Sequence, residues 1–286
     1  MDSDKVIAKL NALREKGPPT VAAFQKFVFA FYRSESRTFP WRETRDPYAI
    51  LVSEVMLQQT QTERVVPKYR DFLERFPTWA SLAEASTSDV VKMWMGLGYY
   101  RRALNLHRAA QSVVNEWGGK PPLTAEGLRA LAGVGPYTAS AVAAFAYGEA
   151  TPMIETNIRT VYLHLFFQKR RAVSDKEILQ CVAETMCRKD PRVWFYALMD
   201  LGVVLKRHTK GIHHRSKHHV KQSRFQGSQR QVRAAVLKLV SQEGEVRAVD
   251  VKKKLPFEAE RIAKAVEALE VEGFIVKGTR GVLRIA

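Results

Sequence analysis

The chain has 286 residues, 46% of them hydrophobic and 10% aromatic, which suffices for about two folded domains and excludes general disorder. Its 46 lysine and arginine residues outnumber 29 aspartate and glutamate residues, leaving a formal net charge of +17. So large a positive excess favours a polyanionic partner such as nucleic acid over a merely basic enzyme.

The sequence predicts a cytoplasmic protein without membrane contact, nucleoid-associated if its source is bacterial. No stretch approaches the roughly 18 consecutive apolar residues of a membrane span. The first five residues, Met-Asp-Ser-Asp-Lys, carry acids where a signal peptide has a basic head. The two cysteines, Cys181 and Cys187, fit neither a CxxC redox pair nor a metal knuckle, which excludes disulfide scaffolds and cysteine-ligated clusters.

Residues 1–205 are predicted to form an all-α domain, because they lack sustained period-2 alternation and are divided by short turns rich in proline and glycine. The mostly apolar stretch 48–61 carries Glu54, Gln58 and Gln61 on one helical face. Burial raises the pKa of a carboxyl group, as a general acid working near neutral pH requires. The alternative is a structural glutamate paired with a distant arginine.

Two glycines, Gly133 and Gly135, flank Val134 directly before a helix of small residues that is predicted to run to about residue 146. Glycines permit a tight hairpin and leave backbone N–H groups bare at a helix N-terminus, where a phosphate can bind. A plain glycine-rich connection between two helices fits the same pattern.

A second carboxylate, Glu155, precedes a helix predicted to begin near Asn157. Glutamate is not a favoured N-cap, because its side chain is too long for the local hydrogen bond, so we expect Thr156 to cap the helix. The charge of Glu155 would then either complement the helix dipole or serve chemistry.

Residues 206–228 are predicted to form a basic, histidine-rich linker or DNA-contacting strap. The longer stretch 201–242 contains no aspartate or glutamate, whereas it holds ten lysines or arginines and five histidines. Zinc binding by these histidines is a weaker alternative, because their spacing is irregular. They are His208, His213, His214, His218 and His219.

Residues 229–286 are predicted to form a winged-helix domain, because the order of elements is helix, helix, helix and β-hairpin. The helices are expected at 229–242, 248–255 and 258–271, and the strands at 274–277 and 282–285. Five glutamates at 258–272 make the third helix a poor reader of the major groove. Basic residues elsewhere either meet phosphates or form a solvated face: Lys252, Lys253, Lys254, Lys277 and Arg280.

Four motifs in order give the chain a family resemblance. They are Phe-Pro-Trp-Arg at 39–42, Ser-Glu-Val-Met-Leu-Gln-Gln-Thr-Gln at 53–61, Gly-Leu-Gly-Tyr-Tyr at 96–100 and the glycine hairpin at 131–139. Together they resemble the helix-hairpin-helix (HhH-GPD) DNA glycosylases, specifically the MutY-type adenine glycosylases, over roughly residues 20–205. The fold class implied is an all-α helix-hairpin-helix glycosylase domain followed by the small winged-helix domain.

The resemblance implies catalytic roles for three residues. Glu54 matches the acid that protonates the target adenine, and Glu155 stands where the family has an aspartate that stabilises an oxocarbenium-like sugar. Tyr137 stands beside the scissile bond, where bifunctional relatives have a lysine that forms a Schiff base. An enzyme with tyrosine there is expected to be a monofunctional glycosylase without efficient lyase activity on abasic sites.

The resemblance also implies binding residues. Trp41, Arg42 and Leu57 match the wall of the substrate pocket, with core packing as the alternative for Trp41, Leu57 and Tyr99. The DNA-binding residues are Gln58, Gln59 and Tyr99, which lie in the two motifs that wedge into the duplex as the base is flipped, and Gly133, Val134 and Gly135, which hold a phosphate.

Two departures from the family bear on cofactors and domains. Positions that match the four cysteines of the family's iron–sulfur loop hold Lys206, His213, Ser216 and Gln222. No cluster, metal or other cofactor is therefore expected. The C-terminal 229–286 are too short, and in the wrong order, for the domain with which MutY enzymes inspect 8-oxoguanine.

We therefore expect a base-excision repair enzyme that removes a flipped, mispaired base, most simply adenine opposite 8-oxoguanine or guanine, from double-stranded DNA. A thymine or uracil mismatch glycosylase is the second hypothesis. A noncatalytic DNA-damage binder or winged-helix regulator is the third, and protein partners would use the winged-helix domain.

Overall fold

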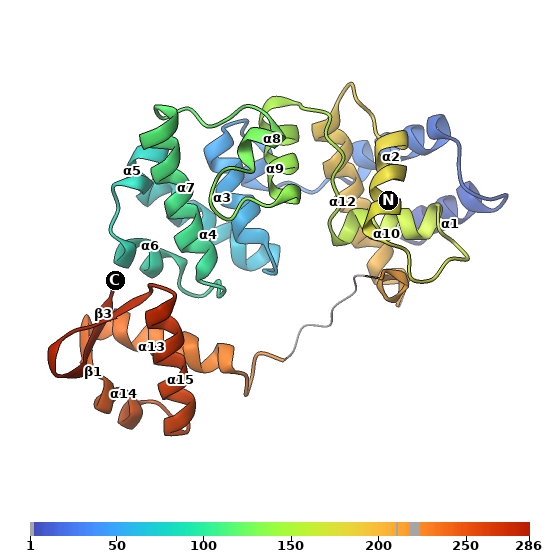
Figure 1. Cartoon of the computed structure of the whole chain (residues 1–286). Coiled ribbons are helices and arrows are strands. Elements are labelled where there is room, and N and C mark those ends of the chain that lie inside the picture. Colours follow the sequence, from blue (N-terminus) through green and yellow to red (C-terminus); the bar gives the residue numbers. More distant parts are fainter. Residues whose placement is uncertain (1–2, 210, 218–223) are drawn as a thin grey trace. The chain divides into compact units, whose positions relative to one another are not determined.

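The computed structural model describes residues 3–209, 211–217 and 224–286, which divide into two compact units (Figure 1). Unit 1 comprises Met1–Glu54, Pro121–Ala130 and Val134–Val220, and unit 2 comprises Val55–Lys120, Leu131–Gly133 and Lys221–Ala286. Each unit therefore combines segments that are far apart in the sequence. None of the helices in the described ranges is both long enough and apolar enough to span a lipid bilayer.

Unit 1 is built mainly from helices. They are α1 (Ser3–Arg14), α2 (Val21–Glu35), the 3-10 turn η1 (Pro40–Arg42), α3 (Pro47–Leu57), which continues into unit 2, α8 (Ala125–Leu128), α9 (Pro136–Val142), the π-helical η2 (Ala143–Tyr147), α10 (Thr156–Leu165), α11 (Asp175–Thr185), α12 (Pro191–His208) and η3 (Ile212–Arg215).

Helix α12 is the centre of unit 1. It begins after Asp190, whose side chain accepts a hydrogen bond from the Val193 amide at 3.1 Å, and Pro191 occupies its first turn. Edge-to-face contacts join Phe24 of α2 to Trp194, with ring centroids 5.2 Å apart. A Cβ at Gly202 would lie 2.3 Å from the Asn157 carbonyl oxygen, so only glycine permits α12 to approach the start of α10 this closely.

Unit 2 combines a helical half with the C-terminal elements. They are α4 (Thr62–Arg75), α5 (Trp79–Ala83), α6 (Thr87–Trp94), α7 (Arg101–Trp117), α13 (Gln229–Glu243), β1 (Glu245–Arg247), α14 (Ala248–Lys254), α15 (Ala259–Val271), β2 (Ile275–Lys277), the 3-10 turn η4 (Thr279–Gly281) and β3 (Val282–Ile285). The strands form an antiparallel sheet in the order β1-β3-β2, with Val246 opposite Leu283 and Ile275 opposite Ile285.

The C-terminal elements share one hydrophobic core with the helical half of unit 2. Val91 of α6 and Leu104 of α7 belong to the same buried cluster as Val236 of α13. Tyr100 also meets Phe274 edge to face, with ring centroids 6.4 Å apart. Residues 229–286 are thus packed against α6 and α7 within unit 2.

The mostly helical architecture is confirmed, and each C-terminal helix and strand expected from the sequence lies within one residue of its predicted bounds. The prediction missed β1, because three residues are too few to show an alternating pattern. The helix expected over 48–61 ends at Leu57 instead, since Gln59 adopts a left-handed φ of 55° that an α-helix does not tolerate.

Candidate active site

Glu54 is a buried carboxylic acid near the end of α3. Its residue is 4% exposed and lies between the buried Ser53 and Val55. The Tyr137 hydroxyl donates a hydrogen bond to Glu54 Oε2 at 2.9 Å. Burial raises the pKa of Glu54 from 4.5 to about 7, and the charge of Glu155 adds to this, whereas the Tyr137 hydrogen bond and Arg42 oppose it. The group is therefore about half protonated near neutral pH.

Arg42, the nearby guanidinium, is engaged elsewhere. It donates to both oxygens of the buried Asp200, with Nη1–Oδ2 and Nη2–Oδ1 distances of 2.8 and 2.9 Å. Arg37 Nε reaches the same carboxylate at 2.7 Å. Among the described residues, no arginine forms an ion pair with Glu54, although the charge of Arg42 lowers the pKa of Glu54. Asp200 carried no sequence signal, since it pairs with an arginine 158 residues away.

Glu155 itself caps α10, so the expectation that Thr156 would do so is wrong. Glu155 Oε1 accepts the backbone N–H groups of Asn157 and Ile158 at 2.7 and 2.9 Å, and Oε2 accepts the Asn157 side-chain amide at 3.2 Å. The backbone of Glu155 is extended, with φ −132° and ψ −178°. In this conformation the long side chain reaches the backbone amides in the first turn of α10. Burial raises the pKa of Glu155, while these amide hydrogen bonds oppose the rise most strongly.

Two tyrosines complete the surroundings of Glu54. The pKa of Tyr137 is raised well above 10 by burial and by the two carboxylates, so its hydroxyl remains a donor. Tyr196, which no sequence motif marks, stacks on Phe145 with ring centroids 4.1 Å apart and lies under the Arg42 guanidinium. Among the described residues, the buried Tyr196 hydroxyl has no hydrogen-bond partner.

Trp41 and Leu57, the other predicted pocket residues, differ in burial. Trp41 is 3% exposed and stacks on Phe39 with ring planes 9° apart, so its ring is part of an aromatic layer in unit 1. Leu57 is half-buried at the end of α3, in unit 2.

The glycine hairpin has the geometry that its sequence predicts. Gly133 has a left-handed φ of 74°, which favours glycine, and a Cβ there would lie 2.6 Å from the Asn105 Cβ. Both the backbone conformation and the lack of space therefore require glycine. Val134 is buried, whereas Gly133 and the N-cap Gly135 are exposed. No side chain caps α9 among the described residues, and its first residue, Pro136, has no backbone N–H to donate.

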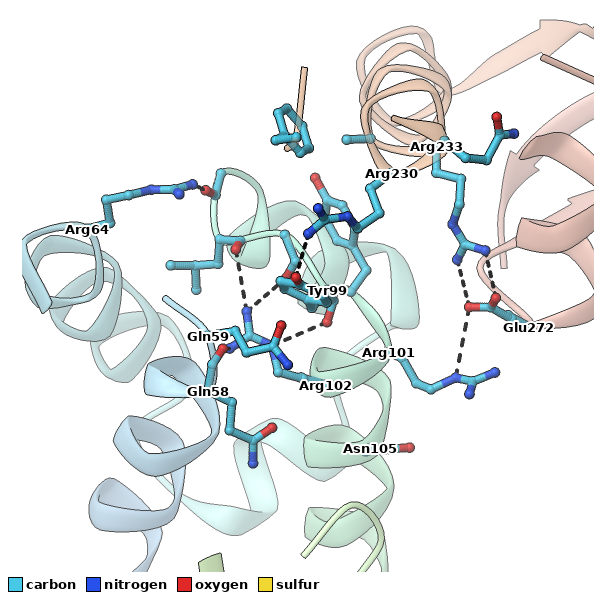
Figure 2. A pocket seen from close by; sticks show the side chains of 17 residues that line it. Gln58, Gln59, Arg64, Tyr99, Arg101, Arg102, Asn105, Arg230, Arg233 and Glu272 are labelled. Carbon is cyan, nitrogen blue, oxygen red and sulfur yellow. Dashed lines mark hydrogen bonds and ion pairs between the residues drawn. The ribbon is translucent and has the colours of Figure 1, made fainter. Parts of the chain in front are cut away.

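Gln58, Gln59 and Tyr99 lie together in unit 2 around a buried arginine (Figure 2). Arg102 Nη1 donates to the carbonyl oxygens of Met56 and Gln58 at 2.8 and 2.7 Å, and its Nη2 donates to Gly98 at 3.0 Å. This guanidinium therefore fixes the loops that follow α3 and α6. No sequence pattern predicts this role of Arg102, because it depends on contacts across 44 residues.

No metal site emerges from the described residues, where no three histidine, cysteine, aspartate or glutamate side chains are placed to hold an ion. The predicted replacements of the family's cysteines supply no thiolate: Lys206 is an amine and Ser216 a buried hydroxyl. An iron–sulfur cluster does not fit this donor set. The side chain of His213, and His218, His219 and Gln222 altogether, lie outside the described residues.

Comparison with known proteins finds sequence similarity to DNA repair enzymes. Residues 52–186 match the model of the HhH-GPD superfamily base excision DNA repair proteins. Adenine DNA glycosylase of Homo sapiens is 43% identical over 150 residues, which cover 49% of this chain and 28% of that protein. Adenine DNA glycosylase of Mycolicibacterium smegmatis is 36% identical over 180 residues, which cover 62% of this chain and 61% of that protein. The chain therefore spans less than two thirds of these relatives.

A solved structure described as a thermostable thymine-DNA glycosylase is also similar. It is 25% identical, with a TM-score of 0.59, and the match covers 68% of this chain and 94% of that one. The similarity extends across nearly all of that structure.

Because the pKa of Glu54 is raised, replacing Glu54 by glutamine should increase the free energy of unfolding by an amount that depends on pH. Because the folded pKa of about 7 exceeds 4.5, the stability linked to protonation is present below pH 4.5 and is lost as the pH rises through 7. Glu54→Gln should therefore stabilise the protein by about 2 kcal/mol more at pH 8 than at pH 5 in urea unfolding. Glu184→Gln, at an exposed position of unit 1, is the matched control. An equal effect of Glu54→Gln at both pH values would contradict the assignment.

Proposed function

Because the chain belongs to the HhH-GPD superfamily of base excision DNA repair proteins, we propose that it is a DNA glycosylase that hydrolyses the N-glycosidic bond of a mispaired adenine. The observation that carries the proposal is the buried Glu54, held by Tyr137 with a pKa of about 7 and accompanied by Glu155. Its substrate is double-stranded DNA that contains a mismatch or a damaged base, with guanine or 8-oxoguanine opposite the adenine.

The chemistry divides between the two carboxyl groups. Protonated Glu54 donates its proton to a ring nitrogen of the flipped base, so the bond to the sugar breaks and its electron pair leaves with a neutral base. Positive charge then develops on the sugar, and the Glu155 carboxylate stabilises it. Water adds to the sugar carbon and gives its proton to a carboxylate. Tyr137 keeps Glu54 in place by the 2.9 Å hydrogen bond.

Substrate binding is proposed for the remaining predicted residues. Trp41 and Leu57 would form apolar walls for the base, while Arg42 would act by holding Asp200 and Tyr196 in position. The turn at Gly133 and Gly135 is exposed, and its backbone N–H groups would bind a phosphate, while buried Val134 anchors that turn. Gln58, Gln59 and Tyr99 would enter the duplex as the base flips.

For the domains, we propose a glycosylase domain at 1–205, a basic strap at 206–228 and a winged helix at 229–286. The order of α13, β1, α14, α15, β2 and β3 supports the winged helix. It shares a hydrophobic core with α6 and α7, and we propose that protein partners would bind through it. We also propose that the enzyme works without an iron–sulfur cluster, since the matching positions lack thiolates.

A thymine mismatch glycosylase is the second candidate, favoured by the similarity to the thymine-DNA glycosylase structure. A noncatalytic DNA-damage binder is less well supported, because the buried Glu54 with its raised pKa suits proton donation, which binding alone does not require. Excision assays on duplexes that carry adenine, thymine or uracil opposite guanine or 8-oxoguanine distinguish the three candidate functions.

The two carboxyl groups predict distinct mutational effects on excision. Glu54→Gln should lower the excision rate by roughly 10²–10⁴-fold and leave DNA affinity nearly unchanged, because proton donation is lost and the phosphate contacts remain. Glu155→Gln should be similarly impaired. Glu155→Asp should keep measurable activity, since aspartate retains the charge and is a favoured N-cap. Single-turnover excision and equilibrium DNA binding are the measurements.

Glu184→Gln, which changes an exposed carboxylate of unit 1, should excise like the wild type. Excision unaffected by Glu54→Gln would remove this mechanism, and wild-type protein inactive on the whole panel would favour the binder.

A third prediction concerns the tyrosine at position 137. Since Tyr137 offers no amine, DNA strands should break only after alkali or heat, and borohydride should trap no covalent adduct. Tyr137→Lys is the positive control, expected to gain a trapped adduct if the side chain faces the sugar. Efficient trapping by the wild type would overturn the monofunctional assignment, and its loss in Lys206→Ala would identify the amine responsible.

A further inference from the structure

Lys206, in the last turn of α12, is a half-buried cation of unit 1 that takes part in no step of the proposed reaction. Its ammonium group forms no hydrogen bond or ion pair with a residue in the described ranges. Burial lowers the pKa of Lys206, and the charge of Glu155 counteracts this. A charge that is withdrawn from water without a close partner costs free energy. Packing alone would be served as well by an uncharged side chain of similar length.

Gly202, one helical turn before Lys206, places this cation beside the start of α10. A Cβ at Gly202 would lie 2.3 Å from the Asn157 carbonyl oxygen and 2.6 Å from the Asn157 Cβ. Residues four apart share one face of a helix, and helical side chains lean toward the N-terminus of their helix. The Lys206 side chain therefore extends over the space that the missing side chain of Gly202 leaves, next to Asn157.

The carboxylate of Glu155 lies at the same asparagine. Its Oε1 accepts the backbone N–H of Asn157 at 2.7 Å, and its Oε2 accepts the side-chain amide of Asn157 at 3.2 Å. Burial raises the pKa of Glu155, whereas the positive charge of Lys206 lowers it. The close approach of α12 to α10 thus brings a cation and a buried carboxylate within electrostatic range of each other.

Arg159, a second cation near Glu155, is already paired. Its Nε and Nη2 donate to the two carboxylate oxygens of Asp175 at 2.9 and 2.8 Å. Asp175 therefore compensates most of the charge of Arg159, and the influence of Arg159 on the pKa of Glu155 ranks below that of Lys206.

Two groups from other helices also face Glu155. They are Glu54 of α3 and Tyr137 of α9, since the charge of Glu155 raises the pKa of both. Neither contributes a positive charge, and an ionised Glu54 would disfavour a second carboxylate beside it. Glu155 therefore lies between a group on α3 that opposes its charge and the ammonium group on α12 that favours it.

We propose that Lys206 is a positioning residue of the glycosylase reaction: its ammonium group keeps Glu155 ionised, and so able to stabilise positive charge on the sugar, without contacting the substrate. The proposal rests on the proposed function, because only there does an ionised Glu155 have a task. Position 206 matches a cysteine of the family's iron–sulfur loop, so the family resemblance gives Lys206 no such role.

The pH profile of single-turnover adenine excision by the full chain tests this role. The wild-type rate should fall at acidic pH as Glu155 becomes protonated. Lys206→Met keeps the length of the side chain and removes its charge, so this acidic decline should move to higher pH by roughly one unit, which is about a tenfold loss of rate on the acidic side. The alkaline decline, which Glu54 sets, should stay where it is.

Two further variants show whether charge is the cause. Lys206→Arg retains the positive charge and should restore the wild-type acidic decline. Lys189→Met, which removes an exposed lysine of unit 1 just before α12, is the matched control and should leave the profile unchanged.

A double-mutant cycle in urea unfolding measures the same interaction without excision. At alkaline pH, Lys206→Met should lower the urea midpoint relative to its effect in Glu155→Gln protein, because only an ionised Glu155 attracts the ammonium group. Lys189→Met should have the same effect in both backgrounds.

Coincident pH profiles of Lys206→Met and the wild type would overturn the proposal, as would equal shifts in Lys206→Met and Lys206→Arg. A uniform loss of rate at every pH together with weaker DNA binding would also overturn it, by showing that Lys206 contacts a phosphate. If the wild type excises no base, the urea cycle decides. Coupling between positions 155 and 206 would then support the electrostatic pairing while the glycosylase function fails, and absence of coupling would reject both.

Discussion

The ion pair between Arg42 and the buried Asp200 is the interaction on which the rest of the candidate active site depends. A guanidinium that paired with Glu54 would hold its pKa low and leave no proton to donate at neutral pH. Asp200 takes both arms of that guanidinium and a third hydrogen bond from Arg37, so the influence of Arg42 on Glu54 is smaller than those of burial, Tyr137 and Glu155. Glu54 is therefore buried without a neutralising partner, which costs stability and supplies an acid.

Burial raises the pKa of both carboxyl groups, but their hydrogen-bond donors differ. Glu54 has one neutral hydroxyl donor, whereas Glu155 accepts two backbone N–H groups at the start of α10. Helix N-termini favour negative charge, so Glu155 suits the role of the anion and Glu54 that of the acid. Gly202 supports this division, because its missing side chain lets α12 hold the start of α10 in place.

Two kinds of sequence pattern predicted parts of this structure: the periodic spacing of apolar residues and short motifs. The C-terminal helices followed from apolar spacing, and Glu54, Tyr137 and the glycine hairpin from their motifs. What the sequence could not supply were pairings over long separations, such as Arg42 with Asp200 and Arg230 with Tyr99, 158 and 131 residues apart. The assignment of Thr156 as the N-cap failed because cap preferences describe short side chains, while extended backbone at Glu155 lets a longer one reach the same amides.

The most direct test of the central claim is the pH dependence of single-turnover excision in wild-type protein and in Tyr137→Phe. If Glu54 is the proton donor, the wild-type rate should fall as the pH rises through about 7. Tyr137→Phe removes a hydrogen bond that lowers the pKa of Glu54, so the decline should move to higher pH, whatever happens to the maximal rate. A rate that does not vary across this range, or a decline at the same pH in both proteins, would contradict the assignment of Glu54 as the acid.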